Sequence, residues 1–257
     1  MAEFIYGHWP IMEALRSGRR SFEQLLITET VDEKGLVAEI INAAQERNVP
    51  LRRVPRRIID DLAGGANHQN MALRVGGYPY VDPEDILETA RKRGEKPFIL
   101  LLDLLKDPQN VGTLMRVADA VGVHGVIIQE RRGVAITPAV SSASSGAVEH
   151  LQVAQVTNLV HTMRELKEQD VWMVGLDIGP NTPPIDKQDL NMSLGLVLGS
   201  EGEGMRRLVR DTCDLLFCLP MRGHVASLNV ATVGSVALYA AWRARGWEGW
   251  AHAQTGR

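Results

Sequence analysis

The first 77 residues alternate between short apolar and polar blocks, a pattern typical of a small α/β domain. Val37, Ile40, Ile41 and Ala44 recur at the spacing of one helix face and predict an amphipathic helix. Shorter apolar blocks bounded by turn residues predict strands at 25–27, 51–54 and 71–75 and helices at 10–15, opened by Pro10, and 58–62. This alternation suffices for one small domain.

The pattern changes between residues 78 and 96. Gly-Gly and Tyr-Pro pairs precede a charged run from Asp82 to Lys96, which contains one helical segment at residues 83–93. Such a composition is typical of a linker. We therefore predict a small domain at residues 1–77, a linker with one helix at 78–96, and a second domain at 97–257.

The second domain contains continuous apolar runs, which predict strands buried on both faces. They lie at residues 98–103, 125–129, 171–176, 194–198 and 215–219, and helical segments at 111–121, 138–145, 159–168 and 204–210 fall between them. Alternating buried strands and helices favour an α/β fold with a mostly parallel sheet covered on both sides. Ligands of such sheets bind at the carboxyl ends of the strands, so the loops after these strands are the candidate sites.

The loop after the first run contains Asp107-Pro108, a turn signal, and Asn110, which suits a helix N-cap. Arg116 lies further along the following helix among apolar neighbours. A charged group in so apolar a segment usually has a specific partner. An Arg whose stem packs while its head reaches water is the alternative interpretation.

A second loop, from Gly199 to Gly204, has three glycines and the carboxylates Glu201 and Glu203. Glycines permit close backbone approach to a ligand and positive φ. Their order does not match the dinucleotide fingerprint, and no Gly-Lys-Ser/Thr follows. The carboxylates favour a ligand with cationic or hydroxyl groups over a polyphosphate.

The third stretch, residues 219–243, passes from a strand through Pro220 into a loop of small residues and then a helix rich in Ala and Val. Ser227 and Asn229 stand at the start of this helix, where backbone N–H groups lack partners. Two interpretations stay open here. The two side chains either cap a core helix or form one wall of a polar ligand site.

Charge and composition narrow the classes of function. The net charge of −3 shows no global basic signature, but four arginines, Arg52, Arg53, Arg56 and Arg57, crowd around Pro55. They are either solvated surface or contacts to the phosphates of a nucleic acid, and in the second case neutralising them weakens that binding and flattens its salt dependence.

The sequence gives no support for a metal site, for a signal peptide or membrane span, or for a disulfide. The seven histidines show no paired metal-ligand spacing, so we expect no metal. The absence of a signal peptide and of a membrane-length apolar run favours a cytoplasmic protein without a membrane partner. The two cysteines, Cys213 and Cys218, are expected to be reduced and buried.

Taken together, the three loops resemble the motifs of the SpoU (TrmH-like) branch of the SPOUT RNA 2′-O-ribose methyltransferases, from about Phe98 to Trp242. The N-terminal region resembles the L30e-like RNA-binding domain attached in this family. His68-Gln69 stands in a loop that commonly has the sequence His-Gln-Gly, with Asn70 in place of the glycine.

This resemblance implies a deep trefoil knot in the second domain, a homodimer formed through it, and S-adenosylmethionine as cofactor. The cofactor would meet the backbone at Gly199, Leu219 and Leu228, with Met221 completing an apolar slot. The family's functional positions are matched by Asn110, Arg116, Glu201, Ser227 and Asn229, and RNA-binding positions by His68 and the N-terminal arginines. Within this pattern Arg116 would grip the phosphate beside the target ribose.

The branch that the sequence resembles most methylates the ribose 2′-OH of a guanosine in large-subunit (23S) rRNA. Three alternatives stay open. The substrate is a tRNA or an rRNA adenosine; or the protein is a catalytically silent RNA-binding factor of ribosome assembly; or it is a dehydrogenase on a doubly wound sheet. Retention of all five functional positions weighs against the second, and the missing fingerprint against the third.

Overall fold

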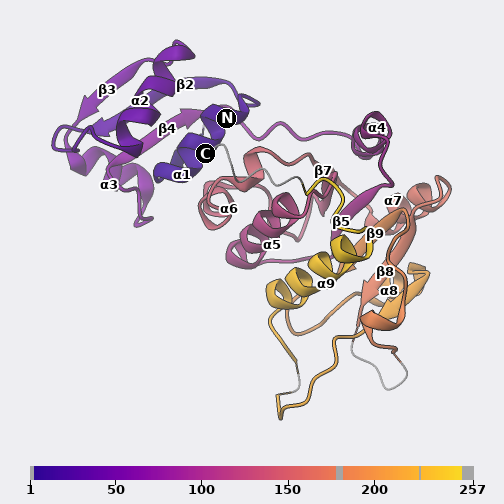
Figure 1. Cartoon of the computed structure of the whole chain (residues 1–257). Coiled ribbons are helices and arrows are strands. Elements are labelled where there is room, and N and C mark those ends of the chain that lie inside the picture. The colour runs from indigo at the N-terminus through magenta and orange to yellow at the C-terminus, as the bar shows by residue number, and fades with distance from the viewer. Residues whose placement is uncertain (1–2, 178–181, 226, 251–257) are drawn as a thin grey trace. The chain divides into compact units, whose positions relative to one another are not determined.

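The computed structural model describes residues 3–177, 182–225 and 227–250, which divide into two compact units (Figure 1). The first unit holds the chain up to Tyr80 together with Asp107–Arg116 and Ile136–Leu151. The second holds Val81–Lys106, Val117–Ala135 and the chain from Gln152 onward. Each unit is built around one sheet with helices, so the predicted α/β class is confirmed.

The sheet of the first unit has four strands in the order β1-β4-β2-β3. β4 runs antiparallel to β1 and β2, whereas the edge strand β3 is parallel to β2. The elements of this part are β1 (Glu3–Tyr6), α1 (His8–Ser17), β2 (Phe22–Thr28), α2 (Leu36–Glu46), β3 (Leu51–Val54), α3 (Arg56–Ala63) and β4 (Met71–Val75).

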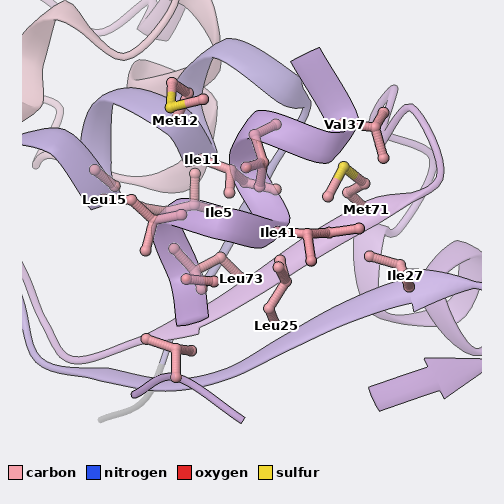
Figure 2. Packing of buried hydrophobic residues seen from close by; sticks show 14 of the residues in the cluster. Ile5, Ile11, Met12, Leu15, Leu25, Ile27, Val37, Ile41, Met71 and Leu73 are labelled. Carbon is pink, nitrogen blue, oxygen red and sulfur yellow. The ribbon is translucent and has the colours of Figure 1, made fainter. Parts of the chain in front are cut away.

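Helices cover both faces of this sheet. Successive side chains of a strand point to opposite sides, so the apolar residues of these strands pack against a helix on each face. Ile5, Leu25 and Leu73 pack with α1 and α2, among them Ile11 and Ile41 (Figure 2). On the other face, Tyr6, Leu26 and Ala72 pack with Ile59 of α3. The four positions predicted to form one helix face, those of α2, are the buried ones.

The sheet of the second unit has six strands, all parallel, in the order β10-β8-β9-β5-β6-β7. Its strands are β5 (Phe98–Leu102), β6 (Gly125–Gln129), β7 (Val153–Val156), β8 (Trp172–Leu176), β9 (Leu194–Leu198) and β10 (Leu215–Phe217). The remaining helices of the chain are α4 (Pro83–Arg93), α5 (Pro108–Ala120), α6 (Pro138–Ala143), α7 (Leu159–Lys167), α8 (Arg207–Thr212) and α9 (Val230–Ala244), with short 3-10 turns η1 (Ala147–Glu149) and η2 (Ile185–Lys187). Of these, α6, η1 and the larger part of α5 belong to the first unit.

The central strands β5, β6 and β9 are buried along their whole lengths, as the continuous apolar runs predict. On one face, α4, α7 and α8 cover the sheet through Ile86, Met163 and Val209. α9 contacts β9. The carboxyl ends of β8, β9 and β10 lie at one edge, because the strands are parallel.

The sequence analysis missed two strands, β1 and β7. Both are four residues long and lie at sheet edges. A short edge strand has too few residues to show the alternation of apolar and polar positions that predicts a strand. It forms because it pairs with a strand that is distant in the sequence. β1 pairs with β4, about 70 residues later in the chain.

Four helix starts differ from the prediction. α3 begins two residues early, at Arg56. α1 begins at His8, so Pro10 is its third residue rather than its first. α5 begins at Pro108, so the prediction of Asn110 as its N-cap was wrong; Asp107 Oδ1 instead accepts the N–H of Gln109 at 2.9 Å. α8 begins at Arg207 and not at Gly204, because Gly204 has a φ of 71° and pairs with Ser200.

The two cysteines flank β10 as free thiols, as expected, but both are half-buried rather than buried. Burial raises the pKa of the Cys213 thiol to about 12, so this group stays protonated at neutral pH. Within the ranges given above, none of the helices has both the length and the apolar content needed to cross a bilayer.

Candidate functional site

A cavity of about 480 Å³ opens at the carboxyl ends of β8, β9 and β10 in the second unit. The end residues Leu176, Leu198 and Phe217 line it, together with the loops that follow β9 and β10. This is where a parallel sheet is expected to hold its ligand. The volume lies within the usual range of small-molecule sites, roughly 300–1,000 Å³.

Seven of the residues singled out in the sequence meet at this cavity. Three segments contribute them: the loop after β9, the loop after β10 and the entry to α9. They are Gly199, Glu201, Leu219, Met221, Ser227, Leu228 and Asn229. The structure thus brings two of the three predicted loops together in one site.

The glycines of the loop after β9 have a steric reason. Ser200 and Gly204 exchange two backbone hydrogen bonds of 3.0 Å each, so the loop folds back on itself tightly. Gly202 and Gly204 have φ values of 84° and 71°, in the left-handed region. A Cβ on Gly199 would lie 2.1 Å from the backbone carbonyl carbon of Gly204. Only glycine fits there without moving the backbone.

Asn229 is the N-cap of α9. Its Oδ1 accepts the N–H of Ala231 at 2.8 Å and that of Thr232 at 3.3 Å. It also lines the cavity, so the residue caps the helix and stands at the candidate site at the same time. Ser227 stands in the same wall.

The charge of the cavity wall is one-sided. The described residues that line it include three carboxylates, Asp177, Glu201 and Glu203, and no Lys, Arg or His; Asp177 is itself paired with Arg210 at 2.7 Å. Leu176, Leu219 and other large apolar side chains supply the apolar part of the wall. The arrangement suits a ligand with an apolar body and a cationic group, and it disfavours a polyphosphate.

A buried carboxylate fixes the far end of the glycine loop. Asp103, just after β5, is fully buried and accepts two hydrogen bonds from Arg206, each of 2.8 Å, from its backbone N–H and its Nε. Arg206 Nη2 lies 2.7 Å from the same carboxylate. The sequence analysis missed Asp103; an acid directly after a fully apolar strand run was the available signal.

Asn110 and Arg116 belong to the first unit. Arg116 is exposed, and its Nη1 donates to Ser145 Oγ at 3.1 Å, so its head reaches water, as the alternative interpretation expected, and also has a specific partner. Gly112, on the same helix, approaches the backbone of Ala143 and Ser144 so closely that a Cβ would clash. Asn110 is buried.

The N-terminal arginines lie on the edge strand β3 and the first turn of α3, and all four are exposed. Arg53 pairs with Glu33 at 2.7 Å, and Arg56 lies 3.7 Å from Asp60. Arg52 and Arg57 have no ion pair with any described residue. Two of the four charges are therefore available to an anionic partner.

His68 is buried inside its loop and not presented at the surface. Its Nδ1 accepts the N–H of Asn70 at 3.1 Å, and its Nε2 donates to Asp60 Oδ1 at 2.7 Å. Asn70 has a φ of 65°, a conformation that glycine and asparagine tolerate best. The side chain of His68 shapes the loop, and the asparagine preserves the backbone turn that the glycine supplies in the resembled motif.

No group of three or more metal-ligating side chains occurs among the described residues.

Both parts of the chain match known protein families. Residues 97–239 match the SpoU rRNA Methylase family, and residues 4–81 match the RNA 2′-O ribose methyltransferase substrate binding domain. The chain is 40% identical over 243 residues to YacO of Bacillus subtilis, described as a TrmH family tRNA/rRNA methyltransferase, covering 95% of this chain and 96% of that protein.

Two solved structures share the fold. The SpoU methyltransferase AviRb from Streptomyces viridochromogenes, in complex with the cofactor AdoMet, aligns with a TM-score of 0.78 at 23% identity, covering 96% of this chain and 91% of that one. An AdoMet-bound rRNA methyltransferase from Sinorhizobium meliloti aligns with a TM-score of 0.78 at 21% identity, covering 94% and 87%. The family match over residues 97–239 and the 40% identity to YacO show that this chain belongs to the SpoU rRNA methylase family, a family of RNA methyltransferases.

Proposed function

We propose that this protein transfers a methyl group from S-adenosylmethionine to the ribose 2′-OH of a guanosine in 23S rRNA. The observation that carries the proposal is the cavity at the ends of β8, β9 and β10, into which the glycine loop and the entry to α9 converge. Membership of the SpoU family supports RNA as the substrate, and the resemblance of the sequence motifs supports guanosine and 23S rRNA.

The residues of the cavity fit S-adenosylmethionine. This molecule combines an adenine, which needs apolar contacts, with sulfonium and ammonium cations, which suit a wall of carboxylates. Leu219 and Leu228 would hold the nucleoside with the backbone at Gly199, and Met221 would close the slot. AdoMet is the cofactor in the AviRb complex. When bound, it supplies an electrophilic methyl group.

The other side chains have the task of holding the RNA and managing a proton. Arg116 would bind the phosphate beside the target ribose through its planar fork. A guanidinium does not lose its proton in proteins, so a carboxylate or a phosphate must accept the hydroxyl proton. Glu201 would orient the cofactor, and Ser227 and Asn229 would complete the polar wall of the cavity. Asn110 is kept as a catalytic position on the resemblance of the sequence motifs.

RNA selection would begin at the N-terminal domain, for which we propose the boundaries 1–77, followed by the linker at 78–96 and the methyltransferase domain at 97–257. Arg52 and Arg57 on β3 and α3 are its available cations. His68 would act through the loop that it holds in shape. The trefoil knot and the homodimer implied by the resemblance stay predictions.

Methylation of rRNA tests the proposal. Purified protein and labelled S-adenosylmethionine are incubated with 23S rRNA or with bulk tRNA, and 2′-O-methyl positions are mapped. Label on a guanosine ribose of 23S rRNA is expected, and Arg116→Ala should abolish it while cofactor affinity stays within about twofold of wild type. Label on tRNA or on an adenosine would show that the proposed substrate is wrong and identify the actual one. Equal loss of cofactor binding in Arg116→Ala would overturn the role proposed for Arg116.

A further inference from the structure

A second groove, of about 600 Å³, lies in the second unit beside the carboxyl ends of β6 and β7. Gln129 is the last residue of β6, Thr157 follows β7, and α8 closes the opposite side. We call it the arginine groove. It is lined by Gln129, Thr157, Asn158, Val160, Arg164, Arg206, Arg207, Leu208 and Val209.

Positive charge converges on this groove from two helical segments. Arg164 comes from α7, and Arg206 and Arg207 come from the entry to α8. None of the described lining residues is acidic. Guanidinium groups around one hollow repel each other, and an anion in the groove relieves that repulsion.

The three arginines differ in how freely they can meet an anion. Arg206 is anchored by the buried Asp103. Arg207 has a side chain that is 92% exposed and touches Asp211 only at 3.5 Å. Arg164 is exposed and forms no ion pair with any described residue. Arg164 and Arg207 therefore keep most of their donor capacity for a ligand.

The groove also contains an unsatisfied polar group. Gln129 is 6% exposed, and its Oε1 has no hydrogen-bond partner among the described residues. A buried acceptor without a donor is unfavourable. A ribose hydroxyl or a base amino group entering the groove offers the missing donor. Leu208, which is 67% exposed, adds an apolar contact surface at the same place.

Successive parts of one segment line the cavity at the ends of β8, β9 and β10 and the arginine groove. Gly199 to Gly204 line the cavity, and the chain then reaches Arg206, which lines the groove. Asp103 holds Arg206 at the groove end of this loop through two hydrogen bonds of 2.8 Å. A ligand that spans them carries its reacting group to the cavity while its anionic part lies against the arginines.

We propose that the arginine groove binds the phosphodiester backbone of the RNA substrate next to the nucleotide that is methylated. The inference rests on the proposed function, because it takes RNA as the substrate. A nucleotide strand has the phosphate for Arg164 and Arg207, hydroxyl and amino donors for Gln129 and apolar ring faces for Leu208. A free inorganic anion has only the first of these.

The test removes the two available cations and leaves the anchored Arg206 in place. The double variant Arg164→Ala/Arg207→Ala in the full-length protein is compared with wild type and with Lys92→Ala/Arg93→Ala, which removes the same charge from exposed positions of α4. RNA affinity is measured by fluorescence anisotropy from 50 to 200 mM salt with a fragment that wild type methylates. Cofactor affinity is measured by calorimetry.

Loss of two phosphate contacts to single-stranded RNA should lower the slope of log affinity against log salt concentration by about 1.4. The ratio of wild-type to groove-variant RNA affinity should therefore shrink by about sevenfold between 50 and 200 mM salt. Cofactor affinity should stay within twofold, and the α4 variant should keep the wild-type slope. A groove variant with the slope of the α4 control, or one that loses cofactor affinity equally, overturns the proposal. Absence of methylation by wild type would instead refute the proposed function.

Discussion

The guanidinium of Arg20 and the carboxylate of Glu149 form a buried, two-pronged ion pair in the first unit. Arg20 Nε lies 2.8 Å from Glu149 Oε2, and Nη2 lies 3.0 Å from Oε1, with each side chain 1% exposed. Ser141 Oγ donates to the same carboxylate at 2.8 Å, and Glu3 reaches Arg20 at 3.2 Å. The pair ties the segment Ile136–Leu151 to the N-terminal strands.

The same segment carries the partner of Arg116. Ser145 accepts the hydrogen bond of Arg116, four residues before Glu149. Tyr78 adds hydrogen bonds from its hydroxyl to the carbonyl oxygens of Val148 at 2.9 Å and Leu151 at 2.6 Å, and burial raises the pKa of Tyr78 to about 12. The segment that contacts Arg116, the residue proposed to bind the target phosphate, is thereby held in place by Arg20 and Tyr78.

Replacing Glu149 should destabilise the protein strongly. Glu149→Ala leaves the Arg20 guanidinium buried with only the half-exposed Glu3 as a counter-charge, and breaking a buried pair costs about 3–5 kcal/mol. Urea unfolding measures the loss. Asp32→Ala, which removes an exposed pair with Lys34, serves as control and should change stability by less than about 1 kcal/mol. Equal effects of the two substitutions would contradict the role given to the buried pair.

Gly199→Ala should abolish cofactor binding. The added Cβ meets the backbone of Gly204 and Met205 at 2.1 Å, so the loop must move away from the cavity. Calorimetric titration with S-adenosylmethionine is expected to show affinity at least about 100-fold weaker, equivalent to about 2.7 kcal/mol. Gly223→Ala, in the loop after β10, has open space around its Cβ and should bind normally. Normal binding by Gly199→Ala would show that the loop does not form the site.

Asn229 should respond to substitution as a helix cap. Asn229→Ala removes the acceptor for two backbone N–H groups of α9 and should cost about 1 kcal/mol of folding stability. Asn229→Ser, which keeps a capping oxygen, should lose at most a few tenths of that. Thermal unfolding compares the three proteins, and an alanine variant as stable as wild type would rule out the capping contribution.

His124 should make stability depend on pH. Its Nδ1 accepts the N–H of Phe98 at 3.0 Å, and its Nε2 donates to Glu95 at 2.9 Å, so the neutral ring is the one that fits. Burial lowers the pKa of His124 below its ordinary value, and this effect outweighs the opposing charge of Glu95. The unfolded chain therefore binds a proton first, and the free energy of unfolding should fall as pH drops from 7 through about 6.5 toward 5.

His124→Asn is the matching variant, because its side-chain oxygen can still accept the N–H of Phe98 while carrying no titratable proton. Urea unfolding at several pH values should show a shallower fall in stability for the variant than for wild type. Identical pH profiles would place the origin of the dependence elsewhere in the chain.

The sequence alone determined the local elements and the chemistry of the cavity wall. The apolar positions of α2 and the apolar runs of β5, β6 and β9 correctly predicted which residues are buried. This works because the periodicity of apolar residues along one segment shows which side of it packs against the core. The glycines of the loop after β9 and the polar residues at the start of α9 indicated where the cavity lies. They could do so because positions that need a positive φ or a close backbone approach select glycine.

Tertiary structure decided the relations between distant segments. The ion pair of Arg20 and Glu149 joins positions 129 residues apart, and β1 exists only because β4 offers it an edge. Parallel strand order brings Arg164 of α7 and Arg207 of α8 around one groove, although neither stood out in the chain. Nothing local distinguishes an arginine that faces solvent from one that converges with others, since that depends on which strands lie side by side.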